Sequence, residues 1–452
     1  MRRLLCLTAV LSTWALSLGC AEPPPESEPD PGPSLDPWVH EIPGSVQPSA
    51  IASGPFGDLF LGGRFLGGLD FGAGVLPVQP SGSVFVAHLD AEGKHLMSGS
   101  TGSKDDLLSV AIGPEDNLYA VGSVDGEMSF GSGKLLGTRD AFLTAFSLDE
   151  PRFTRQINGT NPVYMHNVAA TPQGNVVIAA SVDATTDLGK GPDSDMPSPE
   201  TVVAEYGPEG DLLWTVRLPN NATGRVGLAV DKDGNVYFSA TTYGEVNFAG
   251  QTLPYGMFVA KIGADGTPLW LLGPEDASNY VPVTRDLATD EEGNLYVSGF
   301  YYYDPFSLGG VSLPPSQQVN GYVVKLSPEG KGLYAKAFVM NDYAATIDIA
   351  AAPGGDLLVA LSLQGGADLG GGFIGGASYE SHALLGRLGP MGEHKRSMSV
   401  DGQGARYVYD IAADPKGQMV LLGGYGSIVD LEGTRLVADN DRGTYVARLS
   451  LR

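Results

Sequence analysis

A hairpin pattern that recurs about every 60 residues constrains this 452-residue chain more than any other feature. Each copy has one polar residue that opens the second strand of a tight hairpin, at Asp58, Asn117, Asn175, Asn235, Asn294, Asp356 and Gln418. The intervals between these residues are 59, 58, 60, 59, 62 and 62 residues. A fixed period of this length is typical of a solenoid or a propeller, because one such repeat cannot bury its own apolar face. The chain is therefore predicted to stack similar units side by side.

The turn residues explain why each copy should form antiparallel strands. Five of the seven turns have proline at the second position, and six end in glycine. Proline presets φ for the second residue of a type I turn, and glycine accepts the left-handed conformation that follows. Two further apolar segments complete each of the first six copies, such as residues 258–262 and the segment that contains Trp270. Four antiparallel strands per repeat predict a propeller blade.

The two ends of the repeat array complement each other. The chain ends after the third strand of the seventh copy, so this copy lacks a fourth strand of its own. Residues 38–44 (WVHEIPG) resemble the fourth-strand segment 214–220 (WTVRLPN) but belong to no copy. Pairing residues 38–42 with the last copy would complete it and remove an exposed sheet edge. We expect an all-β, seven-bladed β-propeller of four-stranded antiparallel blades over residues 38–452, whose last blade is closed by the N-terminal strand.

The composition excludes several functional classes. The net charge is −25, and no basic patch is interleaved with aromatic residues, so nucleic acid is not expected as a partner. The two cysteines, Cys6 and Cys20, precede the repeats, which leaves the repeats without a disulfide, a cysteine-ligated zinc or a cysteine nucleophile. No segment after residue 20 is apolar for the 18 residues that a membrane helix needs. We expect a monomer.

The first 37 residues indicate export and tethering. Residues 1–19 combine two early arginines with an apolar run, as in a secretory signal. Residues 17–20 (SLGC) resemble the lipobox of bacterial lipoproteins, in which the cysteine, here Cys20, is lipidated; leucine stands at −2 and not at the usual −3, which leaves ordinary signal cleavage as the alternative. Residues 20–37 then form an acidic, proline-rich linker that favours an extended chain. The expected location is extracytoplasmic, at the outer membrane or cell surface, with the N-terminal lipid as the membrane contact.

The repeat motifs resemble those of bacterial surface proteins with SBBP-type β-propeller repeats. The resemblance is carried by GNVY at 234–237, NFAG at 247–250 and FVAKI at 258–262. It covers the chain from Trp38 to Leu449, about nine tenths of its length. It implies a seven-bladed propeller on a cell-surface lipoprotein. Since the shared residues are structural, it implies no particular ligand.

One position of the innermost strand is acidic in three adjacent copies. Counting eight residues back from the hairpin residue gives Ala50, Ser109, Asn167, Gly227, Asp286, Asp348 and Asp410. If the three aspartates face a common axis, they suit a hard cation such as Ca²⁺, with His166 as a base beside it. The three aspartates are thus the metal candidates, and together with His166 they are the catalytic candidates. Alternatively, each Asp accepts hydrogen bonds from backbone amides of its own or a neighbouring blade.

Two further groups are candidates for a binding surface. Arg225 and Arg285 lie beside the acidic column, where they could recognise an anionic or polyhydroxylated ligand. Tyr301, Tyr302 and Tyr303 follow Phe300 in an aromatic run, and strand alternation is expected to bury two of these four rings and leave the others near a rim. Exposed tyrosine suits contact with carbohydrate or protein, because it is large and has few rotamers to freeze.

Three functions are consistent with these observations. The leading hypothesis is a lipid-anchored extracytoplasmic propeller that presents a binding surface for a protein or polysaccharide and catalyses no reaction. It rests on the exported, tethered N-terminus and on the lack of a catalytic motif in the sequence. The second hypothesis is a metal-dependent hydrolase or lyase that uses the aspartate cluster. The third is a structural component of the cell envelope. Ca²⁺ is the one cofactor that the sequence suggests.

Overall fold

The computed structural model describes residues 36–101, 106–130, 134–147, 150–192, 200–219, 222–275, 280–342, 344–376, 381–438 and 442–451. The chain divides into Met1–Gly32, which lies outside these ranges, and the unit Pro33–Arg452. The predicted secretory signal, Cys20 and the linker as far as residue 35 therefore lie outside the described residues. Within the ranges given, no helix is long and apolar enough to cross a membrane.

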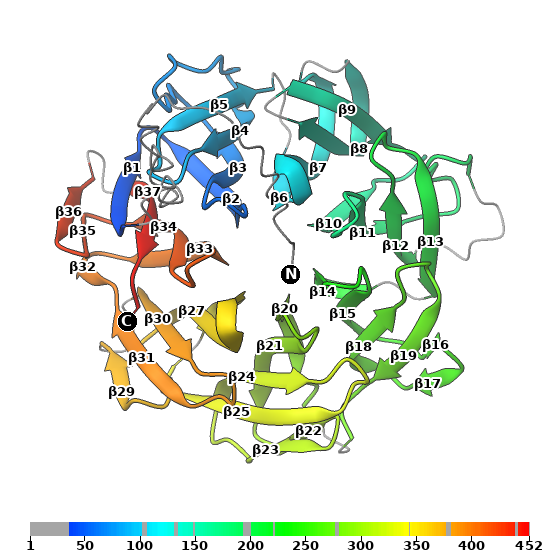
Figure 1. Cartoon of the computed structure of the whole chain (residues 1–452), viewed down its shortest axis with the longest axis vertical. Helices are drawn as coiled ribbons and strands as arrows, with labels where there is room; N and C mark the ends of the chain where they lie inside the picture. Colours follow the sequence, from blue (N-terminus) through cyan, green and yellow to red (C-terminus); the bar gives the residue numbers. More distant parts are fainter. Residues whose placement is uncertain are drawn as a thin grey trace, which may run out of the picture. The chain divides into compact units, whose positions relative to one another are not determined.

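Antiparallel four-stranded sheets build the second unit, and consecutive sheets follow one another around a common centre (Figure 1). This arrangement is a β-propeller, and the predicted all-β class is confirmed. The first three sheets contain β2 (Val46–Ser53), β3 (Leu59–Phe65), β4 (Ser83–Leu89) and β5 (His95–Ser100); β6 (Leu107–Ile112), β7 (Asn117–Met128), β8 (Leu135–Ser147) and β9 (Glu150–Ile157); β10 (Tyr164–Ala170), β11 (Val176–Val182), β12 (Glu200–Tyr206) and β13 (Leu212–Pro219).

The sheets that follow keep this strand order, although one of them gains two strands. They contain β14 (Ala222–Val230), β15 (Val236–Thr242), β18 (Gly256–Ile262) and β19 (Pro268–Leu272); β20 (Val283–Thr289), β21 (Leu295–Tyr302), β24 (Val319–Leu326) and β25 (Gly332–Met340), extended by β28 (Gly366–Asp368) and β29 (Phe373–Gly375); β26 (Ala344–Ala352), β27 (Asp356–Gln364), β30 (Ser381–Leu388) and β31 (His394–Ser399).

A last four-stranded sheet joins the N-terminal strand to the C-terminal part of the chain. Its order is β1-β37-β34-β33, with β1 (Trp38–Ile42), β37 (Gly443–Leu449), β34 (Met419–Tyr425) and β33 (Arg406–Ala413). The remaining elements are β16 (Val246–Phe248) with β17 (Gln251–Leu253), β22 (Phe306–Leu308) with β23 (Val311–Leu313), β32 (Asp401–Gln403) with β35 (Ile428–Leu431) and β36 (Thr434–Val437), and the 3-10 helices η1 (Pro114–Asp116) and η2 (Pro353–Gly355).

Strand β1 occupies the position that β19 holds in its own sheet. It pairs antiparallel with β37, and Trp38 lies opposite Arg448. The indole Nε1 of Trp38 donates to the carbonyl oxygen of Ala91 in the next sheet, at 3.1 Å. Trp270 on β19 makes the equivalent bond to Pro328, also at 3.1 Å. The similarity between residues 38–44 and a fourth strand therefore reflects the same contact with a neighbouring sheet.

The hairpin turns have the backbone conformation that their sequences predict. In every copy the residue before the hairpin polar residue has a positive φ: Gly57 (85°), Asp116 (54°), Gly174 (80°), Gly234 (84°), Gly293 (83°), Gly355 (80°) and Gly417 (73°). Glycine adopts this conformation without the steric cost that a Cβ atom brings. Within the turn, Oδ1 of Asp231 accepts from the backbone N–H groups of Asp233 and Asn235, at 3.0 and 2.9 Å.

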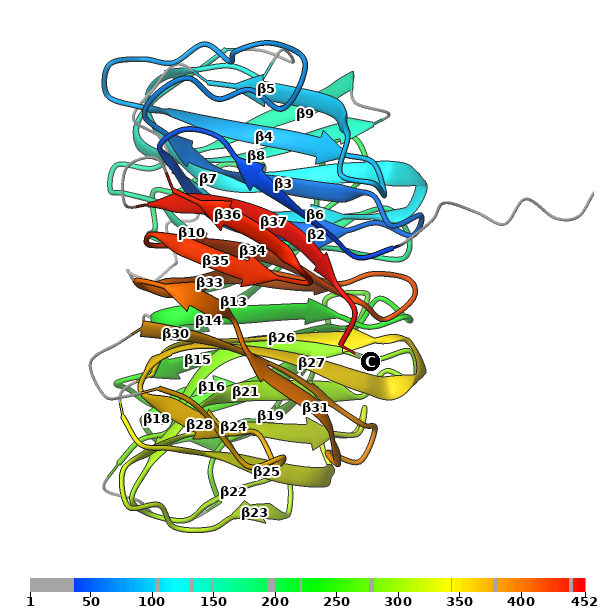
Figure 2. The same cartoon turned by 90° about the vertical axis from the view of Figure 1, so that its left-hand side faces the viewer.

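The core lies between neighbouring sheets, so both faces of each sheet are covered. Strand β11, for example, is buried at all seven positions. From the side, the sheet of β33, β34 and β37 lies between the sheets of β2–β5 and of β26–β31 (Figure 2). Tyrosines of the second strands reach across to the next sheet's turn: the hydroxyl of Tyr237 donates to Gly293 at 3.1 Å and that of Tyr296 to Gly355 at 2.9 Å.

Buried pairs fasten the turn end of the sheets, where each innermost strand meets the second strand. A basic residue of the third strand lies beside a carboxylate of the turn in five sheets: His88–Asp58 (2.8 Å), Lys261–Asp231 (3.6 Å), Lys325–Asp290 (2.9 Å), Arg387–Asp356 (2.6 Å) and Arg448–Asp414 (3.1 Å). Arg448 also donates to the carbonyl oxygens of Ala91 and Gly57 in the next sheet. These pairs draw the turn carboxylates away from the axis and toward the third strand.

Candidate functional site

The predicted column of polar residues converges on one cavity of about 170 Å³, which we call the axial cavity. Its lining comes from the innermost strands and includes Ala50, Ser109, His166, Asn167, Asp286, Asp348 and Asp410. The fixed offset from the hairpin residue placed these side chains at one level. The structure therefore brings together the three aspartates and His166 that the sequence singled out.

The carboxylates of Asp286 and Asp410 link neighbouring sheets through backbone amides. Asp410 accepts from the N–H of the following residue, Ile411, at 2.9 Å and from that of Ile51 in the next sheet at 2.8 Å. Asp286 accepts from the equivalent amides of Leu287 and Ile349, both at 2.9 Å. These are the bonds that the structural interpretation of the column expects. Amide donors favour the ionised carboxylate and use both of its oxygens.

Ser109 and Asn167 also connect two neighbouring sheets. The hydroxyl of Ser109 donates to Oδ1 of Asn167 at 2.7 Å, across the boundary between two sheets. Asp348 is 2% exposed and lines the same cavity. In the part of the chain that the structure describes, no three His, Cys, Asp or Glu side chains are arranged to hold a metal ion. The geometry of the column is thus that of a connection between sheets.

β-Bulges directly before Asn167 and Asp286 determine which side chains lie next to these column residues. The pairing register shifts between Met165 and Asn167 and between Thr284 and Asp286, which makes His166 and Arg285 bulge residues. Bulges redirect side chains. The ring of His166 turns into the axial cavity, with Nε2 at 2.8 Å from Oγ of Ser181. Burial lowers the pKa of His166 to about 4, so the imidazole is neutral at pH 7 and is a weak general base there.

Of the two arginine candidates, Arg285 can be placed, and it does not join the axial cavity. The guanidinium of Arg285 lies over the ring of Phe300, with Cζ at 5.7 Å from the ring centroid. Arg285 is absent from the lining of the axial cavity. The side chain of Arg225 lies outside the described residues. Arg285 therefore does not form a combined site with the aspartates that could bind an anionic ligand.

The aromatic run separates into buried and exposed rings. Phe300 and Tyr301 are each 1% exposed and contribute to two different apolar clusters, because both faces of β21 are covered. The hydroxyl of Tyr301 donates to Pro314 at 3.0 Å, so Tyr301 is a core residue and not a surface contact. Tyr302 is half-buried. Tyr303 is 47% exposed, and its ring centroid lies 4.8 Å from that of Tyr280.

Tyr303 belongs to a larger group that sequence reasoning did not find. Five tyrosines of three consecutive sheets are at least 47% exposed, and we call them the tyrosine surface: Tyr164, Tyr243, Tyr255, Tyr280 and Tyr303. Each lies where an innermost strand begins, a second strand ends or a third strand begins, which is one end of an antiparallel sheet. The sequence did contain a signal for these exposed rings: single tyrosines next to glycine in predicted connections, as in TYG at 242–244 and PYG at 254–256.

Comparison with known proteins yields only distant similarity. No protein-family model and no curated protein matches the chain. A streptogramin B lyase structure aligns with a TM-score of 0.46 and 9% identity over 91% of this chain and 98% of that chain. YCF48 bound to D1 peptide aligns with a TM-score of 0.44 and 10% identity over 93% and 99%. A catalytically inactive variant of virginiamycin B lyase from Staphylococcus aureus, with quinupristin, aligns with a TM-score of 0.45 and 8% identity. The alignment covers 92% of this chain and 100% of that chain. Similarity at this level transfers no activity to the present chain.

Proposed function

We propose that the protein is an extracytoplasmic lipoprotein whose propeller binds a protein or polysaccharide through the tyrosine surface and catalyses no reaction. The contact between the tilted rings of Tyr280 and Tyr303 carries this proposal. The two rings come from different connections, are 49% and 47% exposed, and hold each other in place at 4.8 Å. Rings fixed before binding lose little conformational freedom on contact, and tyrosine combines an apolar face with a hydrogen-bonding hydroxyl.

The axial cavity gives weaker support to a metal-dependent hydrolase or lyase. Both oxygens of Asp286 and of Asp410 already accept backbone amides. A Ca²⁺ ion there would have to share those oxygens, and calcium sites use six to eight oxygen ligands. His166 would be a poor base at pH 7 for the reason given above. The binding function therefore explains more of the observed geometry than the enzymatic one, and a purely structural envelope role leaves the exposed rings unexplained.

The proposal includes seven blades of the SBBP type, with β1 as the fourth strand of the last blade. The pairing of β1 with β37 and the bond from Trp38 to Ala91 support this closure. With β1 in place, β37 is paired on both sides and the last blade has four strands like the others, which fits a monomer. The residues that complete the ring are structural, so closure supplies a rigid support for the exposed connections.

The anchor is tested by replacing the proposed lipidation residue. The full-length protein should partition with membranes and incorporate labelled fatty acid, and Cys20→Ala should lose both properties. Cys6→Ala is the matched control, because Cys6 lies within the expected secretory signal. Label that persists in Cys20→Ala would contradict the lipoprotein assignment and leave ordinary signal cleavage.

The binding function is tested with the Tyr280→Ala/Tyr303→Ala double variant of the full-length protein. Two assays run in parallel: binding to an array of neutral and acidic polysaccharides, and photo-crosslinking on intact cells from a probe at the exposed position 305. Phe56→Ala is the control, since Phe56 is 64% exposed but lies in a hairpin turn at the other end of the sheets. Loss of a saturable signal in the double variant but not in Phe56→Ala supports the proposal and identifies the ligand class. Equal signals in all three proteins would contradict it.

A further inference from the structure

A second cavity, of about 410 Å³, lies at the turn end of the propeller, and we call it the turn-end cavity. Three consecutive residues from each of four hairpin turns line it: Ser53, Gly54 and Pro55; Thr289, Asp290 and Glu291; Ala351, Ala352 and Pro353; Ala413, Asp414 and Pro415. The four turns belong to sheets that follow one another around the centre. The repeat therefore builds this cavity, just as it builds the axial cavity.

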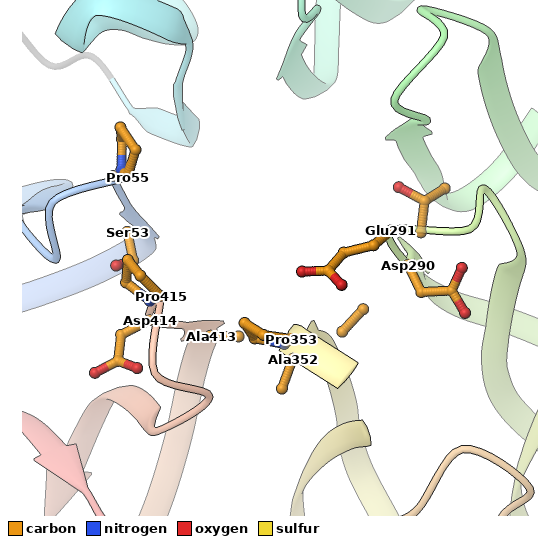
Figure 3. A pocket seen from close by; sticks show the side chains of 12 residues that line it. Ser53, Pro55, Asp290, Glu291, Ala352, Pro353, Ala413, Asp414 and Pro415 are labelled. Carbon is orange, nitrogen blue, oxygen red and sulfur yellow. The ribbon is translucent and has the colours of Figure 1, made fainter. Parts of the chain in front are cut away.

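One residue breaks the symmetry of this lining. The third position is proline in three of the turns, at Pro55, Pro353 and Pro415, and the fourth turn has Glu291 there. Proline at this position was predicted for turn geometry alone. Because the turns gather around one space, the same prolines also form rigid apolar walls. Figure 3 shows the carboxylate of Glu291 extending into the space that these prolines border.

The other two carboxylates of the lining are directed away from the space (Figure 3). Asp290 lies 2.9 Å from Nζ of Lys325, and Asp414 lies 3.1 Å from Nε of Arg448. Their charges are therefore compensated inside the sheets. Glu291 is exposed, and in the described part of the chain it has neither a hydrogen-bond partner nor an ion-pair partner. The lining contains no Lys, Arg or His that could neutralise it.

We propose that the turn-end cavity binds an organic ammonium group carried on a short aliphatic chain. The ammonium would donate to the carboxylate of Glu291, and the methylene groups would contact the proline rings. An exposed ion pair alone contributes little, so the apolar walls are needed for measurable affinity. The volume lies within the range of small-molecule sites, and the proline rings are fixed before binding. This site is separate from the tyrosine surface and does not depend on its function.

The test is a titration of the full-length protein with 1,5-diaminopentane, followed by isothermal calorimetry. The neutral analogue 1,5-pentanediol tests the charge, and an acetylated peptide with one lysine tests whether the ammonium can belong to a protein. Glu291→Gln should weaken amine binding roughly tenfold or more, because it removes a charged hydrogen-bond acceptor. Glu292→Gln is the matched control: this carboxylate is adjacent and exposed but does not line the cavity.

The outcomes separate clearly. Saturable amine binding that is lost in Glu291→Gln, kept in Glu292→Gln and absent with the diol supports the site. The peptide then distinguishes a free amine from a lysine side chain as the source of the ammonium. No saturable binding of either amine, or equal binding by the two variants, overturns the proposal. Thermal melting of both variants accompanies the titrations, and an unchanged melting temperature excludes misfolding as the cause of lost binding.

Discussion

The axial cavity and the turn-end cavity are built by the same innermost strands, yet they treat carboxylates in opposite ways. At the axial cavity, the carboxylates of Asp286 and Asp410 accept hydrogen bonds from backbone amides of two sheets. At the turn-end cavity, Asp290 and Asp414 turn away to buried cations, and the exposed Glu291 faces the space. A polar residue that recurs at one position of a repeat thus serves the fold. The residue that interrupts the recurrence is the better candidate for a ligand.

The largest loss of unfolding free energy is expected where a buried turn carboxylate loses its cationic partner. Arg448→Met leaves Asp414 buried without its cation, since both side chains are 0% exposed. Breaking such a pair costs about 3–5 kcal/mol of unfolding free energy. Lys232→Met is the control, because its partner Asp233 is 63% exposed, and the unfolding free energy should hardly change. Equilibrium urea unfolding measures both, and equal losses would contradict the structural role of the buried pair.

A smaller effect is expected at the axial cavity. Asp410→Ala removes the acceptor from two amides, those of Ile51 and Ile411, and should lower the unfolding free energy by about 2–4 kcal/mol. Asp410→Asn retains a carbonyl oxygen for one amide, so roughly half of the loss should return. Glu291→Ala should stay within about 0.5 kcal/mol of the wild type. If Glu291→Ala lowered the unfolding free energy and Asp410→Ala did not, the roles assigned to the two cavities would be wrong.

Acid should lower the stability of the protein through His166, which lines the axial cavity. Its pKa is lowered by burial to about 4 in the folded protein, against 6.5 in an unfolded chain, so the unfolded state binds the proton first. Stability from this group is complete above pH 6.5 and is lost as pH falls toward 4, by about 3 kcal/mol in total. His166→Gln should flatten the unfolding free energy between pH 6.5 and 4. An unchanged slope would show that other groups govern this window.

Below pH 4 both proteins should continue to lose stability together. The pKa of Asp290 is lowered, with burial opposing the change and hydrogen bonds from Asn294 and Lys325 favouring the carboxylate. Such a group contributes stability that disappears as pH falls through its folded pKa. The His166→Gln profile should therefore run parallel to that of the wild type in this lower range.

The smallest effect sharpens the contrast at the turn-end cavity. Glu291→Pro gives the fourth turn the proline of the other three and should raise stability by about 0.4–1 kcal/mol, because proline restricts the unfolded chain. The same change should abolish binding of 1,5-diaminopentane. Stability and binding would then move in opposite directions at one residue. A loss of stability would mean that the backbone of Asp290 or Glu291 does not tolerate proline.

The sequence predicted most of the fold, because the hairpin turns are local. The positive φ of residues such as Gly234, and the exception at Asp116, follow from neighbouring residues alone. The period also placed the aspartate column at one level. It could not say that Ile51 and Ile349 present amides to those carboxylates, since that depends on the spacing between sheets. For the same reason Tyr301 was a surface candidate, although a neighbouring sheet covers it.

The pairing of β1 with β37 also affects folding, because β1 is synthesised long before its partner strand. Trp38 on β1 lies opposite Arg448 on β37, 410 residues later in the chain. At synthesis rates of roughly 5–20 residues per second, β1 waits about 20–80 s before its partner strand exists. During this time β1 is an unpaired strand, and the β37 of another chain can accept it as well as its own. Folding at high protein concentration should therefore produce strand-exchanged dimers, which dilution before folding would prevent.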